Sequence, residues 1–176
     1  MKIQNSKFII LYKKEINKYY FILDSILPKN LKEIDNNFSL SIGNAYLDNK
    51  VIDRIWLVNK IKLNQYEDIE ELNGSFSFIF FNHKGELTVI TDRFLSKKIY
   101  FIENHKYTIL SNNLVNISKF ALKEKIISFG NINKNAIFEF LNFRRLYGSK
   151  TFFNNISLLK PASIYQINRN FTSKVN

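Results

Sequence analysis

The chain has 176 residues, of which 45% are hydrophobic and 15% aromatic, and this composition excludes an intrinsically disordered protein. A chain of this length removes roughly 70% of its unfolded surface from water, so one domain with a sizeable core is expected. No apolar run approaches the roughly 20 residues that cross a bilayer, and no secretory cleavage site follows the N-terminal apolar stretch. We therefore expect a cytoplasmic protein without a membrane segment.

The sequence contains no cysteine, which excludes disulfides, zinc thiolate sites and a cysteine nucleophile. Its formal net charge is +11 at pH 7, and such a charge attracts phosphates and anionic surfaces. Lysine greatly outnumbers arginine, and lysine, asparagine and isoleucine are abundant together, as in AT-rich coding sequences. The charge is interpreted as a dispersed basic surface, and nucleic-acid binding is kept as an alternative.

The hydrophobic pattern of the first half predicts a hairpin, a strand and short helices. Apolar runs at 7–12 and 19–23 flank a charged segment, as in a β-hairpin. The strand at 38–47 is expected to end in a loop at Gly43 and Asn44. Near-helical spacing then predicts one or two helices. The apolar residues of that spacing are Ile52, Ile55, Trp56, Val58 and Ile61.

The second half of the sequence predicts strands followed by helices. Two pairs of strands surround the turns "NHKGE" and "ENHK" and are interpreted as a β-meander. Two amphipathic helices with asparagine caps follow at 112–123 and 131–143, and a final strand ends before 169–176, which is expected to be a polar tail or the start of a linker. Strands clustered apart from helices indicate an α+β layered domain, assigned to 1–168.

Two motifs at the centre of the chain resemble the N-terminal glutamine amidotransferase type 2 domain of the asparagine synthetase family. "ELNGSFSFIFFN" is similar to the family stretch LxGxFAFALYD, and "TDRFLSKKIYF" is similar to RDxxGxKPLYY. The matching residues are Leu72, Gly74, Phe76 and Phe78 in the first motif, and Asp92, Lys97, Ile99, Tyr100 and Phe101 in the second.

Two further segments extend this resemblance over residues 38–168. "GNAYLDNKVID" resembles the GDARLDNRDEL variant of divergent members. "AIFEFLNFRRLYGSKTFFNNISLLKPASIYQI" is similar to YLxxGYxxGxxTLFxxIxxLxPGxxL. The resemblance implies an α+β fold, a four-layer αββα sandwich of two antiparallel sheets of the Ntn-hydrolase-like kind. Complete members release ammonia from glutamine, and a C-terminal ATP-pyrophosphatase domain uses it to amidate an adenylated carboxylate.

The chemistry of active members is missing from this sequence. Their nucleophile is a cysteine directly after the initiator methionine, where this chain has Lys2, and losing such a nucleophile reduces turnover roughly a millionfold. We therefore expect no catalytic residue, no cofactor and no glutaminase activity. As an alternative, removal of the first five residues would expose Ser6 as an N-terminal hydroxyl nucleophile.

The glutamine pocket implied by the resemblance is also eroded. Where active members have an NGE loop for the oxyanion hole, this chain has Ile42, Gly43 and Asn44, so only the glycine is kept. No arginine precedes this loop to bind the substrate carboxylate. Asp53 falls where the family has an aspartate for the substrate α-amine, and it is equally interpreted as an exposed residue at a helix N-terminus.

The remaining polar residues assemble no other site. His83 and His105 are expected in exposed hairpin turns, not at a metal, and the carboxylates of "YEDIEEL" are expected to be solvated. Arg144 and Arg145, after a helix, are candidates for contact with an acidic partner. In the second motif, Asp92 and Arg93 are expected to fix a turn in which a family glycine is replaced by Leu95 and a family proline by Lys98.

The pattern favours a catalytically silent amidotransferase-like domain that docks to an ATP-pyrophosphatase synthetase domain or chain. Family members without the cysteine, such as β-lactam synthetases and lasso-peptide cyclases, take an amine from the substrate and need no ammonia. The sequence lacks the SGGxDS pyrophosphate loop itself, so the partner lies outside it. A glutamine-hydrolysing amidotransferase with an unfamiliar nucleophile and a basic nucleic-acid or anionic-surface binder are the alternatives. Apolar surface left by a missing partner would favour homo-oligomers.

Overall fold

Two interleaved sets of segments form two compact units in the computed structural model. The first unit comprises Met1–Asn5, Asp35–Lys97 and Pro161–Asn176, and the second comprises Ser6–Ile34 and Lys98–Lys160. Each unit therefore needs stretches that are far apart in the sequence. The structure describes residues 2–3, 6–16, 18–23, 32–33, 38–82, 86–128, 130–167 and 174–175.

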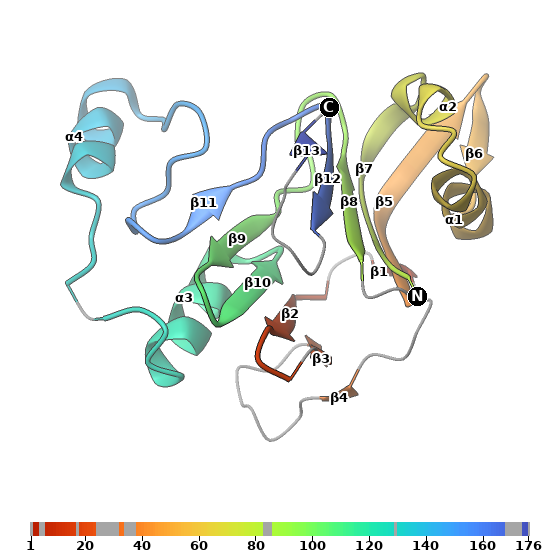
Figure 1. Ribbon diagram of the computed structural model, residues 1–176. Coiled ribbons are helices and arrows are strands. Elements are labelled where there is room, and N and C mark those ends of the chain that lie inside the picture. The colour runs from red at the N-terminus through yellow and green to blue at the C-terminus, as the bar shows by residue number, and fades with distance from the viewer. Residues whose placement is uncertain are drawn as a thin grey trace. The chain divides into compact units, whose positions relative to one another are not determined.

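The first unit contains a seven-stranded sheet in the order β1-β5-β7-β8-β12-β13, with β6 beside β5 (Figure 1). Its neighbouring strands pair antiparallel, apart from β1, which runs parallel to β5. The strands are β1 (Lys2–Ile3), β5 (Ser39–Leu47), β6 (Lys50–Ile52), β7 (Asn73–Phe81), β8 (Leu87–Thr91), β12 (Ser163–Ile167) and β13 (Lys174–Val175).

Two helices, α1 (Arg54–Lys62) and α2 (Glu67–Glu70), cover one face of this sheet (Figure 1). Leu57 and Ile61 of α1 and Ile69 of α2 are buried against the sheet. The expected spacing was wrong for Ile55, which is 63% exposed. Leu57 takes the inward position. The sheet residues of this cluster are Ala45, Phe76, Phe78, Phe80, Ile90 and Ile164.

The second unit contains a six-stranded antiparallel sheet in the order β11-β9-β10-β2-β3-β4. The predicted hairpin at its centre is confirmed, and Tyr12 and Tyr19 stack across it with ring centroids 4.1 Å apart. The strands are β2 (Phe8–Lys13), β3 (Lys18–Leu23), β4 (Lys32–Glu33), β9 (Tyr100–Glu103), β10 (Tyr107–Ser111) and β11 (Ser157–Leu158).

The helices α3 (Leu114–Lys123) and α4 (Lys134–Phe143) belong to the second unit and differ in burial. Their predicted caps are confirmed, because Asn113 and Asn133 each accept a backbone hydrogen bond from the first helical turn. Ile117 and Phe120 of α3 are fully buried beside β2 and β10. In α4 only Ala136 is buried, so its apolar residues do not enter the core.

Three predictions about the sheets require correction or addition. Strand β5 does not end at Gly43 and Asn44 but continues to Leu47, since glycine adopts the positive φ that this point of the strand requires. The expected meander is divided, because β7 and β8 lie in one sheet and β9 and β10 in the other. In the segment expected as a tail, Lys174–Val175 pairs with β12.

Gly43 and Gly74 allow β5 and β7 to approach closely. Both have positive φ angles, of 79° and 120°. A Cβ atom at Gly43 would lie 2.0 Å from the carbonyl oxygen of Ser75, and one at Gly74 would lie 2.4 Å from that of Asn44. Because both obstacles are backbone atoms, they cannot move without disturbing the pairing of the strands. The two glycines are therefore a structural requirement of this sheet.

We predict that Gly43→Ala lowers the free energy of unfolding by about 2–3 kcal/mol, through the steric clash and the unfavourable φ together. Gly148→Ala is the matched control, since Gly148 also has a positive φ, of 68°, but open space around it. The control should lose about 1 kcal/mol. Urea denaturation measures both, and equal losses would contradict the close approach of β5 and β7.

Candidate functional site

Asp92 organises the turn that follows β8. Its side chain is almost fully buried and accepts hydrogen bonds from the backbone amides of Phe76, at 3.1 Å, and Phe94, at 2.8 Å. The amide and hydroxyl of Ser96 also donate to this carboxylate. A buried carboxylate is tolerated because these donors replace water. The prediction that Asp92 fixes the turn is confirmed.

The carbonyl oxygen of Asp92 holds two residues in the left-handed conformation. The amide of Leu95 donates to it at 3.1 Å and the amide of Ala162 at 2.9 Å. Leu95 has φ 52° and Ala162 has φ 49°. Both stand where the resembling motifs have glycine, the residue that adopts this conformation most easily. Each of these side chains in this region costs roughly 1–2 kcal/mol.

The polar residues of the turn and of the neighbouring strand β7 have different environments. Ser77 donates its hydroxyl hydrogen to the carbonyl oxygen of Lys97 at 2.6 Å. A Cβ atom at Gly43 would lie 3.0 Å from Cε of Lys97, so the lysine stem lies against Gly43. Arg93 was expected to fix the turn, but its side chain makes no hydrogen bond or ion pair within the described residues. It is exposed because the turn places it outside the Asp92 network.

A cavity of about 320 Å³ brings together the predicted remnants of the glutamine pocket. Gly43 and Asn44 reach it from β5, and Asp53 reaches it from the start of α1. Phe76 and Phe78 of β7 form part of its apolar wall. These three residues, which are up to ten positions apart in the sequence, therefore line one space, and their identity as remnants of a glutamine pocket stays a prediction. The cavity contains no thiol, since the chain has no cysteine.

The interpretation of Asp53 as a residue at a helix N-terminus is confirmed, and its role toward a substrate α-amine stays a prediction. Its Oδ1 accepts a hydrogen bond of 2.7 Å from the amide of Trp56, so Asp53 caps α1 while it lines the cavity. The neighbouring Arg54 also lines this cavity and donates to the carbonyl oxygen of Ser39 at 3.4 Å. An arginine was expected only before the glycine, whereas Arg54 lies after it in the sequence. No local sequence pattern indicates that Arg54 lines this cavity.

The remaining predicted residues lie apart from this cavity. Tyr100 belongs to β9 and is half-buried, and burial raises the pKa of its hydroxyl. Arg144 ends α4 in the left-handed conformation, and the guanidinium of Arg145 lies 4.4 Å from the ring centroid of Tyr147. His105 is an exposed turn residue, as predicted, and His83 lies outside the described residues.

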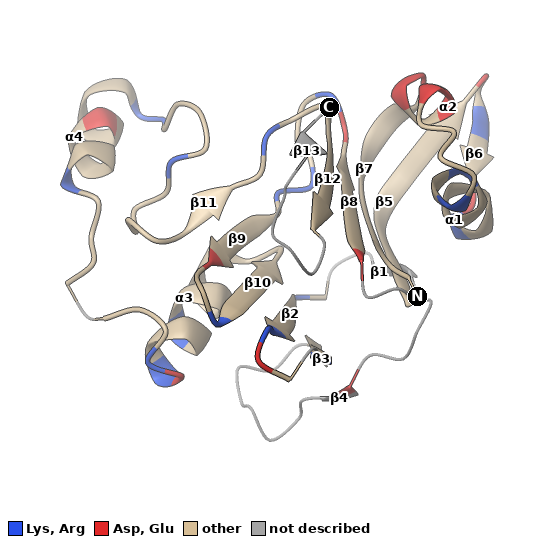
Figure 2. Cartoon of the chain, in the orientation of Figure 1, with Lys and Arg blue, Asp and Glu red and all other residues tan. Residues whose placement is uncertain are grey.

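Acidic and basic residues form no other chemical site in the described chain. The carboxylates around α2 are mostly exposed, as predicted, and Asp68 pairs with Lys60 at 2.7 Å. Among all residues that the structure describes, no group of three or more His, Cys, Asp or Glu is suited to hold a metal. Lysine and arginine are spread over both units with acidic residues between them (Figure 2). No described helix has the length and apolar character to span a bilayer.

Ser6, the alternative nucleophile, belongs to the second unit and is partly exposed. Its carbonyl oxygen accepts a hydrogen bond of 2.9 Å from the side chain of Asn112, which also accepts one from the amide of Phe8. These bonds explain the ordered start of β2. They do not test processing of the chain, so the role of Ser6 stays a prediction.

Two mostly antiparallel sheets, accompanied by few helices in the described part of the chain, define an α+β protein, as the sequence predicted. The model of the glutamine amidotransferase domain family matches residues 57–176. The chain therefore belongs to the glutamine amidotransferase domain family.

Comparison with solved structures finds a likeness to the allosteric regulatory enzyme of purine biosynthesis. The two share 10% sequence identity and a TM-score of 0.49, over 98% of this chain and 43% of that one. This chain thus spans less than half the length of that enzyme. No curated protein matches its sequence.

We predict that Asp92→Asn lowers the free energy of unfolding by about 2–3 kcal/mol, because an amide offers one acceptor oxygen to donors that now share two. Asp48→Asn is the control, since Asp48 is exposed in a turn with positive φ that asparagine tolerates. It should stay within about 0.5 kcal/mol of the parent. Chemical denaturation decides, and an unchanged midpoint for Asp92→Asn would refute the role of its carboxylate.

Substitution of Leu95 tests the left-handed turn directly. Leu95 is only 7% exposed, so both Leu95→Ala and Leu95→Gly lose burial. Glycine also relieves the unfavourable φ, and we expect Leu95→Gly to be more stable than Leu95→Ala by about 1 kcal/mol. At ordinary backbone positions alanine is the more stable of the two. Thermal unfolding of both variants measures which one is more stable. A more stable Leu95→Ala would contradict the positive φ at this position.

Proposed function

We propose that this chain is a catalytically silent glutamine amidotransferase-like domain that docks to an ATP-pyrophosphatase synthetase domain or chain. The observation that carries the proposal is the complete absence of cysteine from a member of the glutamine amidotransferase domain family. Such domains need a strong nucleophile to attack the amide carbon of glutamine. The cavity at Gly43, Asn44 and Asp53 keeps the space for a ligand but supplies no such group.

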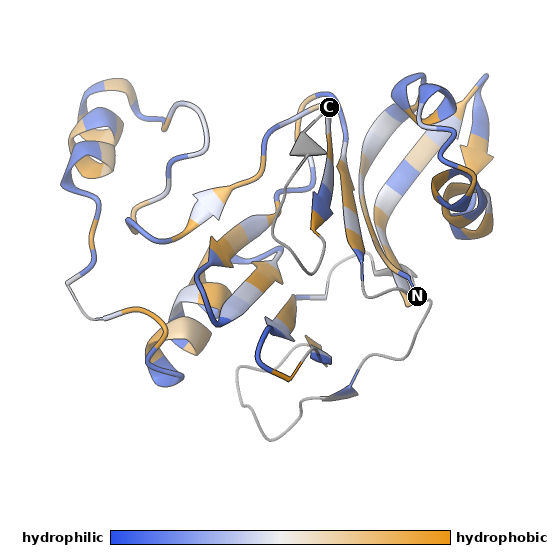
Figure 3. Cartoon of the chain, viewed as in Figure 1, coloured by the Kyte–Doolittle hydropathy of each residue, from blue (hydrophilic) through white to orange (hydrophobic). Residues whose placement is uncertain are grey.

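Helix α4 provides a surface that fits a protein partner. Its apolar side chains are unusually exposed: 70% for Phe138, 63% for Leu141 and 60% for Phe143. Figure 3 shows hydrophobic residues along this helix, although it lies at the surface. Phe138 and Leu141 are three residues apart and therefore share one face of the helix. The edge-to-face contact of Phe140 with Phe152, at 5.5 Å between centroids, holds a different face of the helix. Exposed apolar side chains that share a helix face are typical of an interaction site.

The charges around α4 indicate the chemistry of the partner. Glu139 is paired with Lys150 and accepts a hydrogen bond from the amide of Tyr147, and the hydrogen bond from Lys150 lowers the pKa of its carboxyl group. The charges left at the two ends of the helix are positive, from Lys134 and the predicted contacts Arg144 and Arg145. An apolar patch with an acidic rim on the synthetase complements this surface.

The proposed partner activates a carboxylate with ATP and joins it to an amine of its own substrate. This reaction needs no ammonia, which agrees with a silent glutamine site. The family branch with β-lactam synthetases and lasso-peptide cyclases also needs no ammonia. We therefore propose that the chain is part of a cytoplasmic ligase that makes a modified peptide or another specialised product. The silent domain then contributes a docking surface and not a chemical step.

The docking surface is tested by co-expression with a synthetase chain that carries the SGGxDS loop and is encoded by an adjacent reading frame. We predict that the double variant Phe138→Ser/Leu141→Ser reduces co-purification at least about tenfold, since central apolar contacts dominate interfaces. Ile55→Ser is the control, because Ile55 is as exposed but lies on α1. All these variants should keep the parental melting temperature, since the altered side chains are exposed.

Two results would overturn the docking proposal. One is co-purification that both variants retain at the parental level. The other is light scattering in which the parent forms homo-oligomers through α4, while the synthetase binds the double variant normally. The second result would assign the apolar surface of α4 to copies of this chain.

A further inference from the structure

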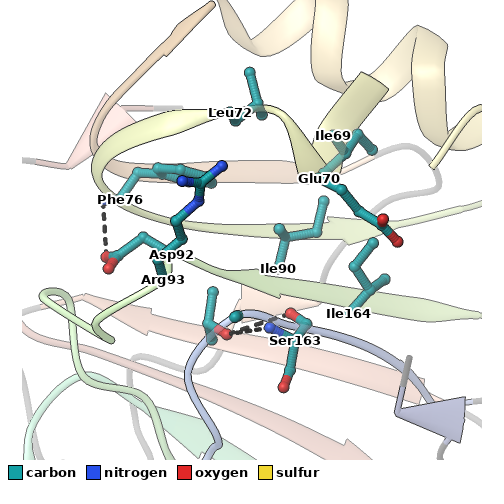
Figure 4. Close-up of a pocket in the computed structure, with 11 residues that line it drawn as sticks. Ile69, Glu70, Leu72, Phe76, Ile90, Asp92, Arg93, Ser163 and Ile164 are labelled. Carbon is teal, nitrogen blue, oxygen red and sulfur yellow. Dashed lines mark hydrogen bonds between the residues drawn. The ribbon is translucent and has the colours of Figure 1, made fainter. Parts of the chain in front are cut away.

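A second cavity of about 350 Å³ lies in the first unit, between α2, the turn after β8 and the start of β12 (Figure 4). It shares Phe76 with the cavity at Gly43 but lies over β7, β8 and β12. Its volume suits a small ligand and is too small for a dinucleotide. The apolar residues of its floor are Ile69, Leu72, Phe76, Ile90 and Ile164.

Three polar residues of this cavity, Thr91, Asp92 and Ser163, already have hydrogen-bond partners within the protein. The amide of Ser163 donates to Oγ1 of Thr91 at 3.1 Å, and that hydroxyl donates to the carbonyl oxygen of Ser163 at 3.3 Å. The carboxylate of Asp92 is bonded to the backbone amides of β7 and the turn. These three residues therefore leave no polar group free to bind a ligand.

Two opposite charges border the floor and have no partner in the described part of the chain. Glu70, at the end of α2, and Arg93, in the turn, both line the cavity, and neither side chain makes a hydrogen bond or ion pair there. Figure 4 shows that they project over different parts of the floor, Arg93 toward Phe76 and Glu70 toward Ile164. Separation explains why they do not pair with each other.

We propose that this cavity binds a short apolar peptide of two or three residues with free ends. Its amino group would meet Glu70 and its carboxylate would meet Arg93, since a guanidinium binds carboxylates well. In a single α-amino acid both charges share one carbon, so it cannot meet two separated groups. In a short peptide they lie roughly 7–10 Å apart. Its apolar side chains cover the floor.

This site does not depend on the synthetase partnership. Its lining comes from α2, β7, β8, β12 and the Asp92 turn, all within the first unit, whereas the proposed docking surface lies on α4 in the second. A failure of either proposal leaves the other standing. Glutamine is also a poor fit, because its polar amide would face an apolar floor.

The test is calorimetric titration of the purified chain with Leu-Leu, N-acetyl-Leu-Leu, Leu-Leu-amide and leucine. We expect saturable binding of Leu-Leu and binding at least about fivefold weaker for the other three ligands. N-acetyl-Leu-Leu lacks the charged amino group, Leu-Leu-amide lacks the carboxylate, and leucine carries both charges on one carbon. Arg93→Gln should weaken Leu-Leu about tenfold and leave Leu-Leu-amide unchanged. Glu70→Gln should weaken Leu-Leu similarly and leave N-acetyl-Leu-Leu unchanged.

Lys98→Gln and Glu71→Gln are the matched controls, because these exposed charges are near in sequence but do not line the cavity. Both should bind Leu-Leu like the parent. No saturable binding of Leu-Leu, or equal binding by the parent, Arg93→Gln and Glu70→Gln, overturns the proposal. Parental melting temperatures for all four variants would show that any loss is local to the cavity.

Discussion

The first unit depends on the burial of one carboxylate, that of Asp92. Through its side chain and its carbonyl oxygen it joins β7, the turn after β8 and the residue before β12. Hydrogen bonds to a charged acceptor contribute roughly 1.5–3 kcal/mol each, and two left-handed residues cost roughly 1–2 kcal/mol each. Several such bonds therefore exceed the strain at Leu95 and Ala162. This balance explains how two residues other than glycine are held in the left-handed conformation at this turn.

Several residues of this glutamine amidotransferase domain have structural roles that do not depend on glutamine chemistry. Gly43 and Gly74 remain because backbone atoms occupy the space that a side chain would need. Asp53 has its own structural reason to remain, as the cap of α1. The sequence contains no cysteine. The combination of filled structural positions and a missing cysteine is what motivates the proposal of a silent domain.

Much of the fold could be predicted from local patterns, and the errors have identifiable causes. Alternation and turn residues located the hairpin of β2 and β3 and the strands β7 to β10 correctly. The division of these strands between two sheets is set by pairings across about a hundred residues, such as β10 with β2, which no local pattern contains. The strand through Gly43 was missed because glycine usually signals a turn, whereas here it permits close backbone approach.

The residues of the candidate site were predicted only in part, because local patterns do not contain the tertiary contacts that complete it. Motif spacing found Asp92 and the lining residues Gly43, Asn44 and Asp53, but it gave Arg93 a role in the turn that the structure does not support. The helix at α4 was predicted from its periodicity, yet periodicity does not say whether an apolar face meets the core or the surface. Arg54 and the second cavity depend on tertiary placement alone.

The central claim is that this amidotransferase domain does not hydrolyse glutamine. The most direct measurement is release of glutamate from glutamine by the purified chain, with the mass of its N-terminus determined in the same sample. The account predicts release no faster than in buffer, with an unprocessed N-terminus. Sustained turnover that is lost in Ser6→Ala, together with a chain that begins at Ser6, would contradict it.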